Sequence, residues 1–393
     1  MPRQGKATRV AVVGATGSVG RSVLDICARF PDRFKVTALA ARSSADSLLE
    51  LAVRFGARKA FLTEPPAGAA KKFAELGIDM TAGAGGLSEI AELPDADNVV
   101  FASSGALAIK SLQLALRAGK DVSLANKESV VAAGPWVMPL VKRPDQLRPL
   151  DSEHSAIWQC IRGEPRKELE SVTLTASGGP FRDLTLDEMK RVTPEDALKH
   201  PVWDMGAKIT VDSASLMNKG IECIEAMHLF GLPHDRVRAV IHPGSCVHGI
   251  AAFSDGTSKM VAYRPDMRIP AAAALAWPDR LPLAQSSEFA FPGFGAGVSL
   301  DFYPPDPARF PCLGIALEAG RKGGAYPPIL VGADEFAVRA FLDKRIPFLG
   351  ISNIIESTLE KYSGPAPSTL EDAIELISLG GRMAGEACAS MGG

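Results

Sequence analysis

A glycine-rich string directly after an apolar segment limits the fold of this 393-residue chain more than any other feature. The segment Arg9–Val13 has the apolar composition of a buried strand, and a helical pattern follows over Ser22–Phe30. Between them lie Gly14, Gly17 and Gly20, and glycines here let backbone N–H groups and a helix N-terminus approach a pyrophosphate. This context favours a dinucleotide site over a helix cap without a ligand. The predicted cofactor contacts are Gly14, Thr16, Gly17, Ser18 and Val19.

The first 150 residues alternate between strand and helix patterns. Such alternation is typical of a parallel sheet whose strands are joined by crossover helices. We therefore predict an α/β fold with a Rossmann-like, dinucleotide-binding domain over residues 1–150. The elements predicted after the glycine string are strands at Lys35–Ala40, Ala60–Leu62, Val99–Ala102 and Val122–Ala125, and a helix from Ala45.

The remainder of the chain predicts two further domains. A second α/β domain with an open sheet is expected over residues 151–280, and a helical bundle over 312–393. Residues 281–311 are rich in Pro and Gly, which indicates a linker. The strands expected in the second domain are Ser171–Ala176, Arg238–Ile241, His248–Phe253 and Lys259–Arg264. The helices expected in the bundle are Leu313–Gly320, Asp334–Asp343, Gly350–Glu360 and Leu370–Ala387.

Charge and cysteine usage exclude several classes of protein. The net charge is −2 without a long run of Lys or Arg, which argues against nucleic acid or a membrane surface as a partner. The six cysteines form no Cys-x-x-Cys pair, so neither a zinc knuckle nor a redox dithiol is indicated. We expect no signal peptide and no bilayer-spanning segment. The expected location is a bacterial-type cytoplasm.

The end of the second predicted strand bears on the choice of cofactor. Enzymes that use NAD usually place an acidic residue there, for the ribose hydroxyls. This chain instead continues Ala41-Arg42-Ser43-Ser44. The guanidinium of Arg42 and the hydroxyl of Ser43 suit a 2′-phosphate, so the sequence predicts NADPH.

Two acidic strings predict a metal site. Asp151 and Glu153 are two residues apart, so on an extended strand their carboxylates would leave the same face. Glu222, at the start of a predicted helix, would supply a third carboxylate. Oxygen ligands without a Cys/His cluster suit Mg²⁺ or Mn²⁺. The alternative is a solvated strand end that binds no ion.

Several separate strings together resemble the 1-deoxy-D-xylulose 5-phosphate reductoisomerase family over nearly the whole chain. They are the glycine string, Leu124–Ser129, Asp151–His154, Ser177–Phe181, His200–Gly206, Met217–Glu222, Pro265–Arg268 and Arg309–Leu313. The resemblance implies a homodimer with an NADPH domain, a central catalytic domain and a C-terminal helical domain. It implies rearrangement of deoxyxylulose phosphate and reduction of the resulting aldehyde to 2-C-methyl-D-erythritol 4-phosphate, a step of non-mevalonate isoprenoid biosynthesis. It does not say whether the carbon skeleton rearranges by retro-aldol and aldol steps or by an α-ketol shift.

The resemblance also implies roles for individual residues. Asp151, Glu153 and Glu222 would hold the metal, and Lys127 would lie beside it as a fourth catalytic residue. Further NADPH contacts are implied for Asn126, Glu128 and Gly206, besides Arg42 and Ser43. The substrate contacts implied are Lys127, Ser152, Glu153, Ser177, His200, Trp203, Ser213, Asn218, Lys219 and Glu222, with His200–Gly206 as a mobile lid.

Two other classes of protein share parts of this pattern. One is a metal-independent NADP oxidoreductase such as a semialdehyde or homoserine dehydrogenase. A thioester-forming semialdehyde dehydrogenase needs a nucleophilic cysteine, and no cysteine here has an evident activating setting. The other is an NADP-binding sensor without catalysis, which three carboxylates and a phosphate-binding set argue against.

Overall fold

The computed structural model describes residues 6–203, 205–291 and 299–391. The chain forms two compact units. The first contains Met1–Ser129, Val137–Ser155 and Asp266–Ala290. The second contains Val130–Trp136, Ala156–Pro265 and Phe291–Gly393.

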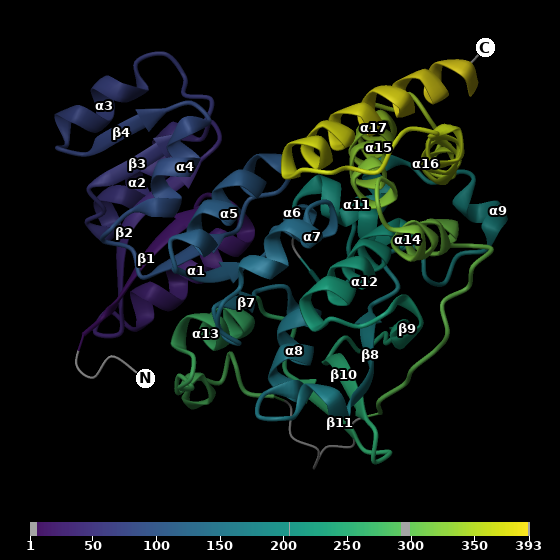
Figure 1. Cartoon of the computed structure of the whole chain (residues 1–393), viewed down its shortest axis with the longest axis horizontal. Helices are drawn as coiled ribbons and strands as arrows, with labels where there is room; N and C mark the ends of the chain where they lie inside the picture. Colours follow the sequence, from purple (N-terminus) through teal and green to yellow (C-terminus); the bar gives the residue numbers. More distant parts are fainter. Residues whose placement is uncertain (1–5, 204, 292–298, 392–393) are drawn as a thin grey trace. The chain divides into compact units, whose positions relative to one another are not determined.

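The first unit is built on a seven-stranded sheet in which every neighbouring pair is parallel, as predicted. The strand order is β4-β3-β2-β1-β5-β6-β7, drawn in purple and blue in Figure 1. Residues 10–13 of β1 and 99–101 of β5, the central strands, are buried and apolar, as expected for a sheet covered on both faces. The strand bounds are β1 Thr8–Val13, β2 Phe34–Ala41, β3 Lys59–Leu62, β4 Asp79–Ala82, β5 Asn98–Phe101, β6 Asp121–Leu124 and β7 Leu147–Pro149.

This sheet has a topological switch point beside β1. From β1 the chain proceeds to β2, β3 and β4 on one side, and then returns to place β5, β6 and β7 on the other. In open parallel sheets, ligands bind beyond the carboxyl ends of the strands at such a point. The glycine string begins at Gly14, directly after β1, and so occupies this position.

One helix of the first unit comes from far along the chain. Helix α13 (Arg268–Ala276), which the sequence analysis grouped with the second domain, packs into the core of the first unit. Ala271 and Ala274 are fully buried there, and the Arg148 guanidinium donates to the carbonyl of Ala274 at 3.0 Å. Local sequence patterns carry no information about this return of the chain.

The second unit contains a four-stranded mixed sheet of order β11-β10-β8-β9. Strands β8 and β9 are parallel, whereas β10 is antiparallel to β8 and to β11. All four strands lie where the sequence predicted them, within one or two residues. Their bounds are β8 Leu169–Ala176, β9 Val237–Ile241, β10 Val247–Phe253 and β11 Ser258–Ala262.

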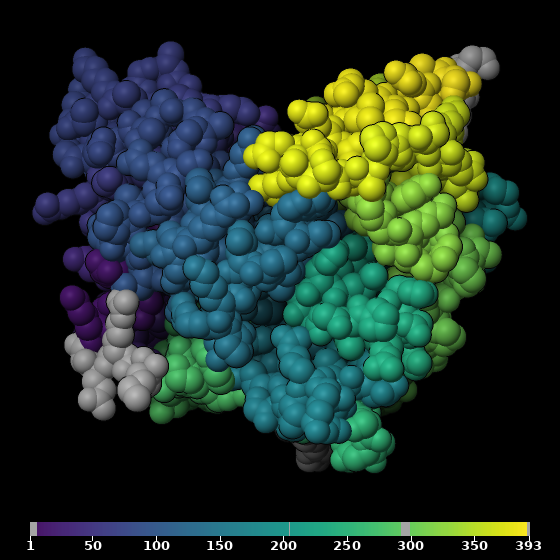
Figure 2. Space-filling model, viewed as in Figure 1, coloured from purple at the N-terminus to yellow at the C-terminus, as the bar shows by residue number. Residues whose placement is uncertain are grey.

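The C-terminal part of the second unit is helical, as predicted. Helix α17 (Leu370–Met391) packs along α15 (Tyr326–Leu342), and Figure 1 shows it in yellow. In the space-filling view its surface continues into that of the preceding light-green helices (Figure 2). Helices α14 (Pro311–Lys322) and α16 (Gly350–Lys361) complete this region.

The predicted linker at residues 281–311 is only partly described, because residues 292–298 lie outside the described residues. Beyond this gap, Tyr303 forms an antiparallel bridge with Ile241 at the end of β9. Among the described residues, no helix has the length and apolar content needed to cross a bilayer. The remaining helices are α1 Ser18–Arg29, α2 Ala45–Phe55, α3 Ala69–Glu75, α4 Gly85–Glu92, α5 Ile109–Arg117, α6 Lys127–Val131, α7 Gly134–Val137, α8 Ser152–Ile161, α9 Leu186–Met189, α10 Pro194–Ala197, α11 Ala207–Ser215 and α12 Met217–Phe230.

Candidate active site

The turn after β1 has room only for glycine at two positions. A Cβ on Gly14, which has a φ of +84°, would lie 2.6 Å from the backbone of Ala102. A Cβ on Gly20 would lie 2.2 Å from the carbonyl oxygen of Gly14. Helix α1 begins at Ser18, and its N-cap Gly17 carries no side chain to occupy the first-turn N–H groups. The N–H groups of Gly14 and Gly17 donate to backbone carbonyls, so the N-terminus of α1 is the part of this segment that suits an anion.

Arg42 lies at the carboxyl end of β2 with an exposed side chain. Its Nε is 2.9 Å from Oε1 of Glu64, which lies two residues beyond the end of β3. Ser43 is also exposed. Glu64 could not be predicted as a partner of Arg42, because nothing in the local sequence pattern brings together residues 22 positions apart.

Asn126 organises the segment that carries Lys127 and Glu128. Its amide nitrogen donates to the carbonyls of Ser103 and Gly105, at 2.8 and 3.0 Å. Its carbonyl oxygen accepts the Ser129 N–H at 3.0 Å, as a helix N-cap does. Asn126 thus joins the loop after β5 to the start of α6, where Lys127 and Glu128 lie almost buried.

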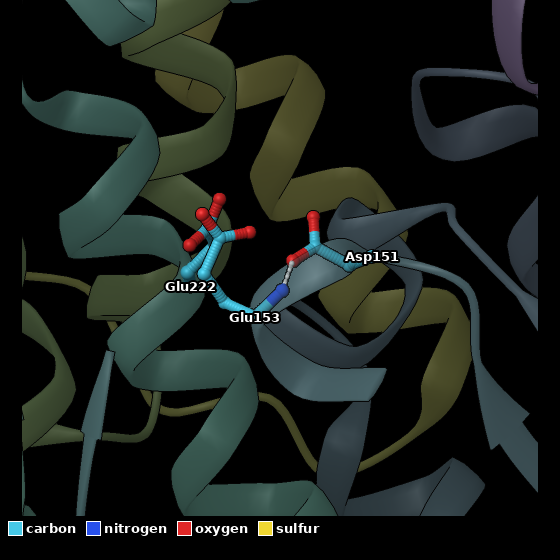
Figure 3. Close-up of side chains that lie close together, drawn as sticks. All are labelled: Asp151, Glu153 and Glu222. Atoms are coloured by element: carbon cyan, nitrogen blue, oxygen red, sulfur yellow. Dashed lines mark hydrogen bonds between the residues drawn. The ribbon is translucent and has the colours of Figure 1, made fainter. Parts of the chain in front are cut away.

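Asp151, Glu153 and Glu222 lie close together, as the metal prediction requires. Each offers one carboxylate oxygen, and these three atoms lie within 4.8 Å of one another (Figure 3). Glu222 is 1% exposed and Asp151 9% exposed, so the group is largely withdrawn from water. Three carboxylate oxygens without Cys or His form a ligand set that fits Mg²⁺ or Mn²⁺.

The prediction that Asp151 and Glu153 share a strand is wrong. Glu153 lies in the first turn of α8, and Asp151 immediately precedes that helix. The backbone carbonyl of Asp151 accepts the N–H of Ser155. The side-chain Oδ1 of Asp151 accepts the N–H of Glu153 at 3.3 Å. Asp151 therefore acts as a helix N-cap, and this turn aligns the two carboxylates instead of a strand pleat.

Basic and hydroxyl groups surround the three carboxylates. Lys127 forms an ion pair with Asp151, and Lys219 forms one with Glu222. The Asn218 amide donates to Glu222 at 2.6 Å, and the Ser152 hydroxyl donates to Glu153 at 2.5 Å. An unpaired carboxylate loses much solvation free energy when it is buried. The two ammonium groups offset part of this cost. Nearby, Nδ1 of the fully buried His154 lies 3.3 Å from Asp151.

A second cluster joins three of the substrate contacts that the family resemblance implies. Nε2 of His200 lies 3.3 Å from the Ser177 hydroxyl and 3.1 Å from the Ser213 hydroxyl. Nδ1 of His200 accepts the N–H groups of Val202 and Trp203, at 3.1 and 2.8 Å. Nδ1 must therefore carry the lone pair, so the proton of the neutral ring is on Nε2 and faces the two hydroxyls. Such convergent donors suit a phosphate.

Trp203 lies beside this cluster. It is partly buried, and its ring meets that of His248 edge-on with centroids 6.1 Å apart. Gly206 is the exposed N-cap of α11, the helix that carries Ser213. The predicted lid also contains Asp204, which lies outside the described residues.

Three segments of the chain match one family. Residues 10–134 match the family model of 1-deoxy-D-xylulose 5-phosphate reductoisomerase. Residues 147–230 match the C-terminal domain of this enzyme, and residues 263–379 match the DXP reductoisomerase C-terminal domain. The chain belongs to the 1-deoxy-D-xylulose 5-phosphate reductoisomerase family.

Individual members of the family agree with this assignment. The reductoisomerase of Pelotomaculum thermopropionicum is 42% identical over 374 residues, which are 93% of this chain and 95% of the relative. That of Thermomicrobium roseum is 46% identical over 365 residues, which are 92% and 93% of the two chains.

Solved reductoisomerase structures have the same fold. The Zymomonas mobilis enzyme in complex with NADPH superposes with a TM-score of 0.88 at 39% identity, covering 97% of this chain and 99% of the other. A DOX-P reductoisomerase in complex with NADPH, fosmidomycin and magnesium gives 0.89 at 34% identity, covering 98% and 99%. The α/β architecture with a helical C-terminal region is thus that of the family.

Proposed function

We propose that the chain carries out its family's reaction with Asp151, Glu153 and Glu222 as the ligands of the metal. The reaction is the NADPH- and divalent-metal-dependent conversion of 1-deoxy-D-xylulose 5-phosphate to 2-C-methyl-D-erythritol 4-phosphate, in non-mevalonate isoprenoid precursor biosynthesis. The observation that carries the proposal is the convergence of these three carboxylates within 4.8 Å.

The cofactor half of the proposal rests on the first unit. Family members bind NADPH and magnesium in their solved structures. The N-terminus of α1, beside the switch point of the sheet, would bind the pyrophosphate, with Gly14, Thr16, Gly17, Ser18 and Val19 as the predicted contacts. Arg42 and Ser43 would contact the 2′-phosphate, with Asn126, Glu128 and Gly206 contributing further contacts. Residues 1–150 would accordingly form the NADPH-binding domain.

The metal half of the proposal rests on charge. A bound divalent ion would supply Lewis-acid chemistry where charge develops on the substrate while a carbon–carbon bond is broken and remade. Asp151, Glu153 and Glu222 would hold that ion. Lys127, already paired with Asp151, would contribute positive charge at the same place. Ser152 would bind a substrate hydroxyl.

The substrate phosphate would bind at the serine–histidine cluster. Nε2 of His200 contacts the hydroxyls of Ser177 and Ser213, and Asn218 and Lys219 lie in the first turn of the helix that carries Glu222. Trp203, on the segment His200–Gly206, would cover the substrate and exclude water. Residues 151–280 would form the catalytic domain, 281–311 a linker and 312–393 a helical domain. The remaining expectations are a homodimer, which the resemblance implies, and a cytoplasmic location, which the unpaired cysteine pattern of the sequence favours.

Isosteric variants of the three carboxylates test the metal site. Asp151→Asn, Glu153→Gln and Glu222→Gln each remove one negative charge without changing side-chain size. Each should weaken Mn²⁺ binding at least about 10-fold, because even changing a residue that merely orients a metal ligand costs this much. NADPH oxidation in the presence of deoxyxylulose phosphate should fall at least as far. Glu170→Gln, at an exposed carboxylate, is the matched control.

Mn²⁺ affinity measured by equilibrium dialysis separates the ligands from residues that only support the fold. NADPH affinity and the melting temperature of each variant check that the protein is still folded. Undiminished Mn²⁺ affinity in all three variants would overturn the metal site. Turnover that persists in chelator would favour the metal-independent dehydrogenase class, and NADPH binding without any turnover would favour the sensor class.

A further inference from the structure

Glu64 lies beside Arg42 because the sheet brings the ends of two strands together. Strands β2 and β3 are parallel neighbours, and Ala41 pairs with Leu62 at their carboxyl ends. Beyond this pair, the Glu64 N–H donates to the Arg42 carbonyl at 2.8 Å. The side chains then meet with Nε of Arg42 2.9 Å from Oε1 of Glu64. The backbone, and not only a side-chain rotamer, therefore sets this pairing.

Arg42 and Glu64 lie beyond the carboxyl ends of β2 and β3, and the glycine turn lies beyond the carboxyl end of β1 in the same sheet. The N–H groups of Gly14 and Ala15 both donate to the Ala40 carbonyl, at 2.9 Å each. Arg42 is two residues beyond Ala40. The guanidinium predicted to contact the 2′-phosphate of NADPH is thus already engaged by a carboxylate.

We propose that Glu64 weakens the preference for NADPH over NADH by competing with the 2′-phosphate for Arg42. The inference rests on the proposed role of Arg42 in cofactor binding. The side chains of Arg42 and Glu64 are 74% and 54% exposed, and exposed ion pairs are weak enough to be exchanged for another anion. A 2′-phosphate that approaches Arg42 also meets the negative charge of Glu64. NADH lacks this phosphate and does not meet this repulsion.

Glu64→Gln tests the competition, because glutamine has the same size without the charge. The variant should bind NADPH about 2- to 5-fold more tightly, the range expected for an exposed ion pair, with NADH affinity unchanged. The gain should shrink at high ionic strength, since exposed charges are screened. Asp46→Asn is the matched control, because it removes an exposed carboxylate that pairs with Lys72.

Arg42→Ala separates this inference from the assignment of Arg42 itself. If Arg42 contacts the 2′-phosphate, the variant should lose about 10- to 100-fold in NADPH affinity and much less in NADH affinity. Adding Glu64→Gln to Arg42→Ala should then leave the ratio of the two affinities nearly unchanged. Equal losses for both cofactors in Arg42→Ala would refute the role of Arg42, and the inference with it. A selective loss in Arg42→Ala together with an unchanged ratio in Glu64→Gln would overturn the inference alone.

Discussion

At the scale of single residues, His200 shows how a short loop sets the state of an ionisable group. Two backbone N–H groups donate to its Nδ1, and burial lowers the pKa of the imidazole below its ordinary value. The folded protein therefore favours the neutral ring. The unfolded chain takes up the proton first, as the pH falls through about 6.5. His200 consequently contributes stability above this pH that is lost progressively below it.

Replacing His200 by Gln should reduce the pH dependence of stability. Between pH 7 and pH 5.5 the free energy of unfolding of the wild type should fall more steeply than that of His200→Gln, because the variant has no imidazole to protonate. Urea titrations over this range measure the difference. His234→Gln, at an exposed histidine, is the control. Parallel curves for the wild type and His200→Gln would contradict the assignment of the shifted pKa.

At the scale of elements, glycine lets α15 and α17 approach to backbone contact. A Cβ on Gly332 in α15 would lie 1.8 Å from the carbonyl oxygen of Ile377 in α17. A Cβ on Gly380 in α17 would lie 2.4 Å from the carbonyl oxygen of Ile329 in α15. The clashing atoms are backbone, so the helices must move apart to accommodate any side chain.

Gly332→Ala should therefore destabilise the fold although alanine is the better helix former. Overpacking of this kind costs about 1–3 kcal/mol. Gly314→Ala in α14 is the matched control, because its Cβ would meet no atom within 4 Å. That variant should gain up to about 1 kcal/mol from helix propensity. Chemical denaturation measures the free energy of unfolding of both variants. Equal effects of the two substitutions would show that the α15–α17 contact can accommodate a methyl group.

At the scale of the whole molecule, the family match extends over both units. The three matched segments run from residue 10 to residue 379. The relatives are covered almost completely as well, at 93–95% of their length for the two described. The chain therefore contains the parts from which its family's enzymes are built.

The homodimer implied by the family resemblance is a prediction at the same scale. Sedimentation equilibrium should give twice the 41.5 kDa of one chain, with no dependence on loading concentration in the micromolar range. A mass of one chain across that range would refute the dimer. A mass that rises with concentration would mean that the association is too weak for a permanent dimer.

By itself, the sequence determined the fold class, and it predicted the glycine turn and the three carboxylates that lie close together in the structure. Strands and helices follow from local periodicity, so the parallel sheet, the mixed sheet and the C-terminal helices could be predicted, although strands β4 and β7 and the first eight residues of α15 were missed. The glycine turn could be predicted because the atoms that leave no room for a Cβ at Gly14 and Gly20 belong to nearby backbone and to one neighbouring strand. The oxygen-only character of the three candidate ligands predicts Mg²⁺ or Mn²⁺.

Only the tertiary structure decided how those residues are held and what lies beside them. The turn that aligns Asp151 with Glu153, the return of α13 to the first unit, the approach of Gly332 to Ile377 and the pairing of Glu64 with Arg42 all depend on spatial contact. Residue types and spacings record local conformational preferences. Contacts between distant segments instead arise when apolar faces are buried together and strands pair in one register, and no local pattern encodes them.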